Sequence, residues 1–441
     1  MTSTNIHSLS PELVASVGEF LDSDGLFNLR FSNRYVCECC LHLFIRRYFR
    51  ERTHLITQHS LDALLDMTQQ PKFGHAMQRL VISRRYLAKL SDEMSFIRDS
   101  GVIAVYLTEV LRNAPNCREI AIDEDCDEPW GLTGFLLDRI VDDLNPTGAG
   151  GPVDDASEMR THYSRQMYYD EGIIEAIVVA ITMSGAEITT FDMSSILSFD
   201  SKGLKIPQSY HPRLSRSPWV NTLTTLKLQL DMATSHFDVS HVKSFVRQFP
   251  RLENFVLKVR PFEGEYSPGD TLVELDKFGF LVEDLYIPRL RTLELSDIHC
   301  LLGNLQEMIE NHRETLTELS LLRVSSCAGA NSSWRSLITA LRDRFRLEKL
   351  SVSACAVSDR VLDFEFEDVG HHNGDSEDDD SDSNDDDEGE SIRLVDFEDQ
   401  ESGDSSASVD VFGRDPQVYD RLLRGLREGM EPKSTQVIRF G

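Results

Sequence analysis

Apolar residues recur with helical spacing along the middle of the chain, and a short strand-like segment follows each helical stretch. Ile103 and Leu107 begin one such helix face. The strand-like segment after it reads Cys117-x-x-Ile120-x-Ile122. The same apolar spacing begins again at positions 77, 188, 223, 252, 290, 316 and 347. This pattern predicts alternating helices and strands rather than a helical bundle or an all-β fold.

A single strand–helix unit cannot bury its own apolar face. Burying one large apolar side chain contributes about 1.5–3 kcal/mol, whereas ordering the backbone of each residue costs about 1–2 kcal/mol. Stacked units share one core, and helices supply the crossovers that parallel strands need. The last five copies lie 29, 38, 26 and 31 residues apart, near the period of leucine-rich repeats. We therefore predict an α/β fold, an irregular leucine-rich-repeat-like solenoid with parallel strands over residues 53–361. An ordinary α/β domain with one open parallel sheet is the alternative.

Two other segments differ from these repeats. Residues 142–165 contain a glycine-rich stretch without the lysine and hydroxyl residue of a phosphate-binding loop, so we interpret them as a flexible insertion. Residues 411–441 regain helical apolar spacing and end in Val437, Ile438 and Phe440. They predict a short helix and strand that dock on the solenoid.

Charge is concentrated in one place. The 441 residues include 45 Lys and Arg and 74 Asp and Glu, a net charge of −29. Residues 363–404 hold 20 acids and one base, which leaves −10 on the rest of the chain. We expect residues 362–410 to be disordered, either as a spacer or as a clamp for a basic partner. Ser376 and Ser383 each have an acid three residues on and are phosphorylation candidates for an acidophilic kinase.

The same composition limits partners and location. Phosphate backbones repel so acidic a chain, so no nucleic-acid partner is expected. No stretch reaches the roughly 18 apolar residues of a membrane span, and the N-terminus has no secretory pattern. Eight cysteines are too few for a disulfide framework. These features favour a cytoplasmic or nuclear protein without a membrane partner.

The first fifty residues pattern as three short helices. Leu13, Val17 and Leu21 form an apolar stripe at helical spacing. Ser10 is placed to cap the first helix, and Pro11 suits its first turn. A three-helix cap on the solenoid would have the same pattern.

These residues resemble a known family. Leu9-Ser10-Pro11-Glu12-Leu13, followed by Leu26-Phe27-Asn28-Leu29-Arg30-Phe31-Ser32-Asn33-Arg34-Tyr35, is similar to an F-box of the filamentous-fungal type. Ser10 replaces the usual first proline, and Gly25 replaces an acid before the second helix. The resemblance covers about 45 residues, and residues 1–52 would be the F-box.

The resemblance implies a non-catalytic adaptor of a ubiquitin ligase. An F-box binds the Skp-type linker of a cullin–RING ligase, and the domain after it holds a protein substrate. Carried over by position, the linker contacts would be Leu9, Pro11, Glu12, Leu13, Val17, Leu21 and Leu26. The same side chains could form the core of the helices, because a stripe this short does not separate a partner face from a core. A repeat scaffold without a ligase role is the alternative.

Substrate contacts are predicted from strand alternation, because residues flanking the buried leucines face the other side of the sheet. These candidates are Lys227, Gln229, Val256, Lys258, Glu294, Ser296, Ser320, Leu322, Ser351 and Ser353. They mix charges and neutral groups, so they indicate no substrate class. No catalytic motif, metal-ligand spacing or cofactor motif stands out, so the sequence predicts no enzyme, metal or cofactor.

Overall fold

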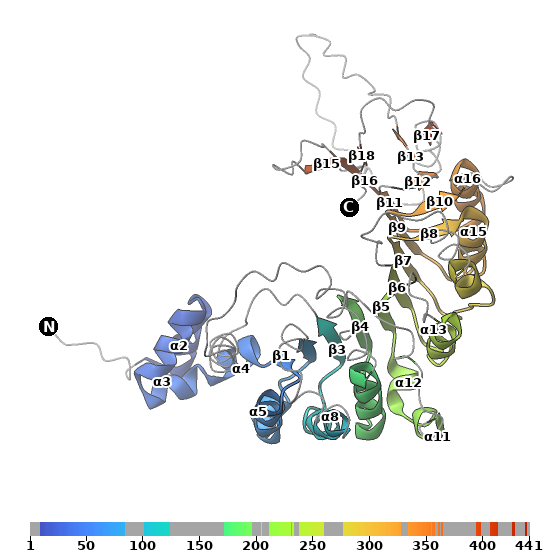
Figure 1. Ribbon diagram of the computed structural model, residues 1–441. Helices are drawn as coiled ribbons and strands as arrows, with labels where there is room; N and C mark the ends of the chain where they lie inside the picture. Colours follow the sequence, from blue (N-terminus) through green and yellow to red (C-terminus); the bar gives the residue numbers. More distant parts are fainter. Residues whose placement is uncertain are drawn as a thin grey trace, which may run out of the picture. The chain divides into compact units, whose positions relative to one another are not determined.

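The computed structural model describes the repeats and the helices that precede them (Figure 1). The described residues are 9–83, 101–123, 172–195, 204, 211–230, 232, 238–259, 277–327, 334–353, 355–357, 360–361, 363–364, 394–397, 406–412, 426–427 and 437–438. They form two compact units, Met1–Gln229 and Leu230–Gly441. The predicted insertion at 142–165 and the phosphorylation candidates Ser376 and Ser383 lie outside the described residues.

The first unit begins with four short helices, where the sequence predicted three. They are α1 (Pro11–Glu19), α2 (Ser23–Ser32), α3 (Arg34–Cys39) and α4 (Leu41–Tyr48). The helix is interrupted at Cys40, which is the C-cap residue of α3 and the N-cap residue of α4. Val36, Cys40 and Phe44 are four residues apart and all buried. The apolar spacing therefore continues through the break and gave no sign of it.

Five parallel strands of the first unit follow in chain order. They are β1 (Glu51–Leu55), β2 (Arg79–Ser83), β3 (Glu119–Asp123), β4 (Thr190–Ser195) and β5 (Thr225–Leu230). Between them lie α5 (Gln58–Gln69), α6 (Pro71–Gly74), α8 (Val102–Asn113), a helix over 172–184, α11 (His211–Leu214) and α12 (Pro218–Thr222). Figure 1 shows α5, α8 and α12 in a row along one side of these strands. Strand β1 begins at Glu51 and so crosses the predicted boundary between residues 52 and 53.

The second unit repeats this plan. Its main strands are β6 (Asn254–Val259), β7 (Thr292–Ser296), β9 (Glu318–Leu322) and β11 (Lys349–Ser353), all parallel and in chain order. The helices are α13 (Val239–Val246), one over 277–282, α15 (Leu302–Glu310) and α16 (Trp334–Arg344). The short strands β8 (His299–Leu301), β10 (Ser325–Cys327) and β12 (Ala356–Val357) form a second parallel row, with β13 (Arg360–Val361) beside β12.

The C-terminal segment contributes short strands, all paired antiparallel except β18, which runs parallel to β16. Strand β16 (Ser406–Phe412) pairs with β11, and β15 (Leu394–Phe397) and β18 (Val437–Ile438) pair with β16. Strand β14 (Asp363–Phe364) pairs with β17 (Leu426–Arg427). These strands include parts of the segment predicted to be disordered, at 362–410. The acidic run itself, at 375–390, and most of the predicted C-terminal helix, at 418–426, lie outside the described residues.

Register places equivalent residues of successive repeats side by side. Leu80, Ile120, Phe191 and Leu226 form one row across four strands of the first unit, each at most 1% exposed. Phe255, Leu293, Leu319 and Leu350 form the same row in the second unit. All are the middle apolar residue of the predicted repeat. Each of the eight predicted copies is therefore a strand.

Backbone hydrogen bonds repeat with the same period. The carbonyl of Arg50, just before β1, accepts from the N–H groups of both Gln78 and Arg79. The Gln78 carbonyl accepts in the same way from Arg118 and Glu119. This two-donor contact recurs in the second unit, so each repeat fixes the start of the next. Because strand order follows chain order without a switch point, each unit is a stack of strand–helix repeats and not a doubly wound sheet.

Candidate interaction surfaces

Helices α1 and α2 present exposed apolar side chains while keeping a core of their own. Leu13 is 56% exposed and Val17 49%, both on α1. Phe20, at the C-cap of α1, is 90% exposed, and Phe31 on α2 is 83% exposed. The core beneath consists of Val14, Leu26, Val36 and Cys40. Exposing this much apolar surface on two short helices is unusual unless a partner covers it.

The predicted linker contacts divide between this surface and the core. Pro11, Glu12, Leu13 and Val17 are exposed, and Leu9 and Leu21 are partly buried against the core. Leu26 is fully buried. α2 directs the Leu26 side chain into the core with Val14 and Val36, so this predicted linker contact is not accessible in the structure.

Caps set where α1 and α2 begin. The Ser10 side chain accepts a hydrogen bond from the Leu13 N–H at 3.4 Å, and Pro11 starts α1 as predicted. Hydrogen bonds from its own backbone N–H and from Ser10 lower the pKa of Glu12. Asp22 caps α2 by accepting from the Gly25 N–H at 2.7 Å.

The local packing around position 25 explains why a glycine is found there. A Cβ atom there would lie 2.8 Å from Asp22 Oδ1 and 3.2 Å from Leu21 Cβ. A side chain at this position would therefore disturb the cap. Asp22 and Asp24 supply the acids of the first turn instead, so the departure from the F-box pattern at Gly25 costs α2 no N-terminal acid.

The predicted substrate-contact residues lie in register on one face of the strands, but several are not accessible. In the second unit, Glu294, Ser320 and Ser351 form one row, and Ser296, Leu322 and Ser353 form the next. Buried members are Val256, Ser296, Ser351 and Ser353, at 8%, 0%, 6% and 2% exposure. Alternation sets the face of a strand and not its exposure, because parallel sheets are commonly covered on both faces. Those four predicted contacts are therefore not accessible in the structure. The predicted contacts Lys258, Glu294, Ser320 and Leu322 are partly accessible.

In the first unit, Lys227 already has a partner. Its Nζ lies 2.8 Å from Asp192 Oδ2, across the β4–β5 pair. Burial acts to raise the pKa of Asp192, but the hydrogen bonds from Lys227 and Ser194 outweigh it and lower that pKa. Lys227 therefore stabilises the sheet, whereas Gln229 on the same strand is partly exposed and has no such partner among the described residues.

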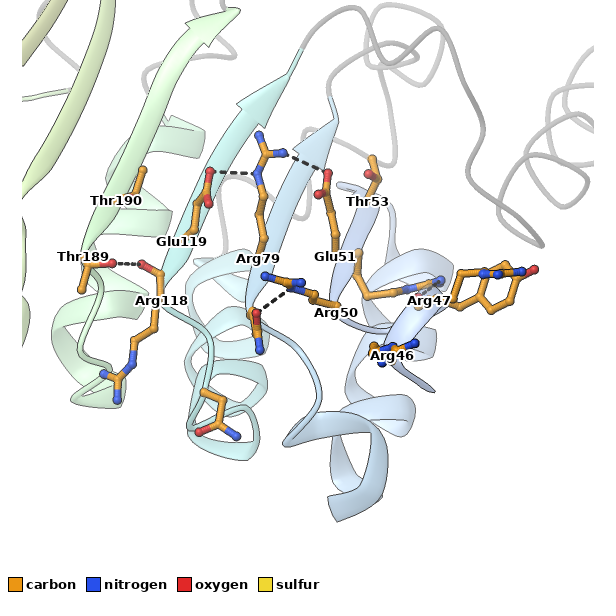
Figure 2. A pocket seen from close by; sticks show the side chains of 14 residues that line it. Arg46, Arg47, Arg50, Glu51, Thr53, Arg79, Arg118, Glu119, Thr189 and Thr190 are labelled. Carbon is orange, nitrogen blue, oxygen red and sulfur yellow. Dashed lines mark hydrogen bonds and ion pairs between the residues drawn. The ribbon is translucent and has the colours of Figure 1, made fainter. Parts of the chain in front are cut away.

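A groove of about 780 Å³ crosses the starting ends of β1 to β4 (Figure 2). Its lining includes six arginines and two glutamates. The arginines are Arg46, Arg47, Arg50, Arg52, Arg79 and Arg118, and the glutamates are Glu51 and Glu119. We call this site the arginine groove. It carries a formal charge of +4 within a chain of net charge −29.

Half of these arginines are neutralised by carboxylates. Arg79 lies 3.0 Å from Glu51 and 2.9 Å from Glu119, which links β1, β2 and β3 in one row (Figure 2). Arg118 pairs with Glu187 at 2.6 Å, and Arg46 with Glu19 at 3.4 Å.

The other three arginines have only neutral partners among the described residues. Arg47 donates to the carbonyl of Leu21 at 2.7 Å, and Arg52 donates to the carbonyl of Tyr48 at 3.2 Å. Arg50 donates through Nε to Gln78 Oε1 at 2.7 Å. Burial lowers the pKa of Arg52. The groove therefore holds positive charge that no described carboxylate balances.

The arginine groove was not predicted from the sequence. One signal was available, because residues 46–52 contain four arginines in a chain that is otherwise strongly acidic. Apart from Thr53, the remaining lining residues come from positions 78–190 and meet the first group only through strand register.

Four buried cysteines are not suited to nucleophilic chemistry. Cys40, Cys117, Cys300 and Cys355 are buried, and burial raises the pKa of Cys117 and of Cys355 to about 12. Within the described ranges, no group of three or more metal-ligating side chains comes together. No helix in the same ranges has the length and apolar character to cross a membrane.

Comparisons with known proteins add little. No protein-family model matches the sequence, and no curated protein matches it. Among solved structures, the chain is similar to the crystal structure of the leucine-rich-repeat-containing protein LegL7 from Legionella pneumophila. The identity is 12%, the match covers 70% of this chain and 92% of that chain, and the TM-score is 0.27. A score of that size establishes no shared fold, so the repeat architecture rests on strand order and register.

Proposed function

We propose that this protein is a non-catalytic substrate adaptor of an F-box-type ubiquitin ligase. In this proposal α1 to α4 bind a Skp-type linker, and the repeats hold a protein substrate. The single observation that supports it best is the exposure of Leu13 and Val17 on α1, and of Phe20 at its C-cap, although α1 packs on a core of its own.

The arrangement suits a docking module for two reasons. Leu13 and Val17 share one face of α1, four residues apart. Phe20 follows three residues later, at the C-cap of the helix. Exposed apolar anchors of this kind supply most of the free energy of protein–protein binding. The sequence resemblance at Leu9 to Tyr35 supports a Skp-type linker as the partner of this face.

The test is direct binding of the full chain to a Skp-type linker. We expect a stable complex at micromolar concentration, measured by size-exclusion chromatography and by titration calorimetry. Absence of a complex at that concentration would remove the ligase role. The repeat stack would then be assigned as an interaction scaffold, which is the second candidate function and is favoured by the repeated strand–helix order alone.

A further inference from the structure

Arg50 is the best-placed free cation of the arginine groove. It is exposed, and its guanidinium uses Nε on Gln78 Oε1. Its two terminal nitrogens have no partner among the described residues. Figure 2 shows Arg50 beside the row formed by Glu51, Arg79 and Glu119. Two planar N–H donors on one guanidinium match the two oxygens of a carboxylate or a phosphate.

The groove has the dimensions of a short peptide. Neighbouring strands lie about 4.8 Å apart, so β1 to β4 span roughly 14 Å. An extended chain advances about 3.4 Å per residue, so about four residues cover that span. The lining also includes the neutral hydrogen-bonding side chains of Gln78, Asn116 and Thr190. A segment with several acidic side chains could therefore contact Arg50 and its neighbours together.

The observations favour a peptide over a nucleic acid. Glu51 and Glu119 lie in the groove and would repel a continuous phosphate backbone. The chain as a whole carries −29, which also opposes approach of a polyanion. A short peptide can place its few charges on Arg47 and Arg50, which no described carboxylate pairs, and avoid the two glutamates.

We propose that the arginine groove binds a short acidic segment of a partner protein, with Arg50 as the principal contact. The anionic groups are carboxylates or phosphates. The inference rests on the proposed function only for its biological role, where this segment would belong to the substrate. The binding itself is independent of whether α1 docks on a linker.

The experiment uses the full chain and fluorescently labelled peptides of about six residues, slightly longer than the span of the groove. One peptide alternates Glu and Ser, a second has phosphoserine at the same serines, and a third has Gln in place of Glu. Anisotropy is measured at low and moderate salt. We expect binding of at least one acidic peptide, weakening with salt, and no binding of the Gln peptide. The first two peptides distinguish carboxylate from phosphate recognition.

The decisive variant is Arg50→Glu, with Arg50→Gln as the neutral step. Because a hydrogen bond to a charged group contributes about 1.5–3 kcal/mol, Arg50→Glu should weaken binding by at least about ten-fold. The matched control is Arg216→Glu, an exposed arginine of the same unit outside the groove. It makes the same change in net charge and should leave affinity within about two-fold, because Arg216 does not line the groove.

Three outcomes would overturn the inference. They are no binding of either acidic peptide, equal loss in the Arg216→Glu control, and tighter binding of a single-stranded oligonucleotide of the same length. Thermal unfolding of each variant establishes that it is folded. Linker binding by Arg50→Glu, measured separately, shows whether the proposed function stands when the peptide site fails.

Discussion

His54 of β1 lies in register with Ile82 of β2, so an imidazole occupies the position that an isoleucine fills in the next repeat. Its side chain is 4% exposed, and Nδ1 lies 3.1 Å from the Ser60 hydroxyl oxygen. Arg52, two residues earlier, is likewise in register with Leu80. The first repeat therefore places two polar side chains where later repeats place apolar ones.

This burial makes the stability of the protein depend on pH. Burial, together with the nearby positive charge of Arg52, lowers the pKa of His54 to about 3. In the unfolded chain its pKa is about 6.5. The unfolded state therefore binds more protons below that value, and the free energy of unfolding falls as pH drops from about 6.5 toward 3. At pH 5 the loss from one such histidine is about 2 kcal/mol.

The variant His54→Leu should reduce this pH dependence, because leucine restores the repeat pattern and cannot be protonated. The Ser60 hydroxyl keeps its bond from the Leu55 N–H at 3.2 Å. Urea unfolding at pH 7.5 and pH 5 measures the effect. Buried His312, whose pKa is also lowered by burial, remains in both proteins. An unchanged difference between the two pH values would show that His54 is accessible to protons in the folded state.

Docking through α1 predicts a specific loss of linker binding. The double variant Leu13→Asp with Val17→Asp should weaken the complex by about a hundred-fold or more, because truncating central apolar anchors commonly costs at least 2 kcal/mol. Stability should change little, since both side chains are exposed. Titration calorimetry with a Skp-type linker measures the affinity.

The control for this variant is Val105→Asp, an apolar side chain of α8 that is 64% exposed. It should bind the linker as the native chain does. Native affinity in the folded double variant would assign Leu13 and Val17 no part in docking.

The buried pair Asp192–Lys227 predicts a stability effect. Lys227→Met should leave the Asp192 carboxylate, 7% exposed, with hydrogen bonds from Ser194 alone. We expect a loss of about 1–3 kcal/mol, toward the lower end because Lys227 is partly solvated. Chemical denaturation measures it. The double variant Asp192→Asn with Lys227→Met should lose less than the sum of the single losses, since no unpaired charge remains. Strict additivity would mean that the pair contributes no coupling energy.

Two glycines predict opposite effects of the same substitution. A Cβ atom at Gly74 would lie 2.4 Å from the Asn113 carbonyl oxygen and 2.5 Å from that of Thr68. Because both are backbone atoms, Gly74→Ala should destabilise the protein by about 1–3 kcal/mol. At Gly303, in α15, a Cβ atom would meet nothing within 4 Å. Gly303→Ala should stabilise the helix by up to about 1 kcal/mol. Denaturation midpoints measure both effects. If both variants unfolded at lower denaturant than the native protein, or both at higher, the packing described here would be contradicted.

The sequence identified most of the repeats because their signal is local. Residues such as Leu226 and Leu228 sit two apart on a strand, and the helix before each strand has its own period, so both patterns are visible within a few residues. Ser10, Pro11 and Glu12 marked the start of α1 for the same reason. Strand β1 was not predicted from the sequence, because Arg52 and His54 occupy positions that are apolar in the other strands.

The same patterns did not predict which side chains are exposed to solvent. Ser320 and Ser351 have equivalent places in their repeats, yet Ser351 is buried and Ser320 is partly exposed. Leu13 and Leu26 both fit a helical stripe, but one is exposed and the other is in the core. The difference depends on what packs against each residue, and that is set by segments distant in the sequence.

The amino-acid order by itself determined the alternation of strands and helices, the start of α1 and the concentration of negative charge, because each depends on neighbours within one or two turns. Only the tertiary structure decided that residues 46–52 meet residues 78–190 in one basic groove, and that Leu26 faces inward while Leu13 does not. Strand register and helix packing bring together residues that share no local period, so no pattern along the chain records their contact.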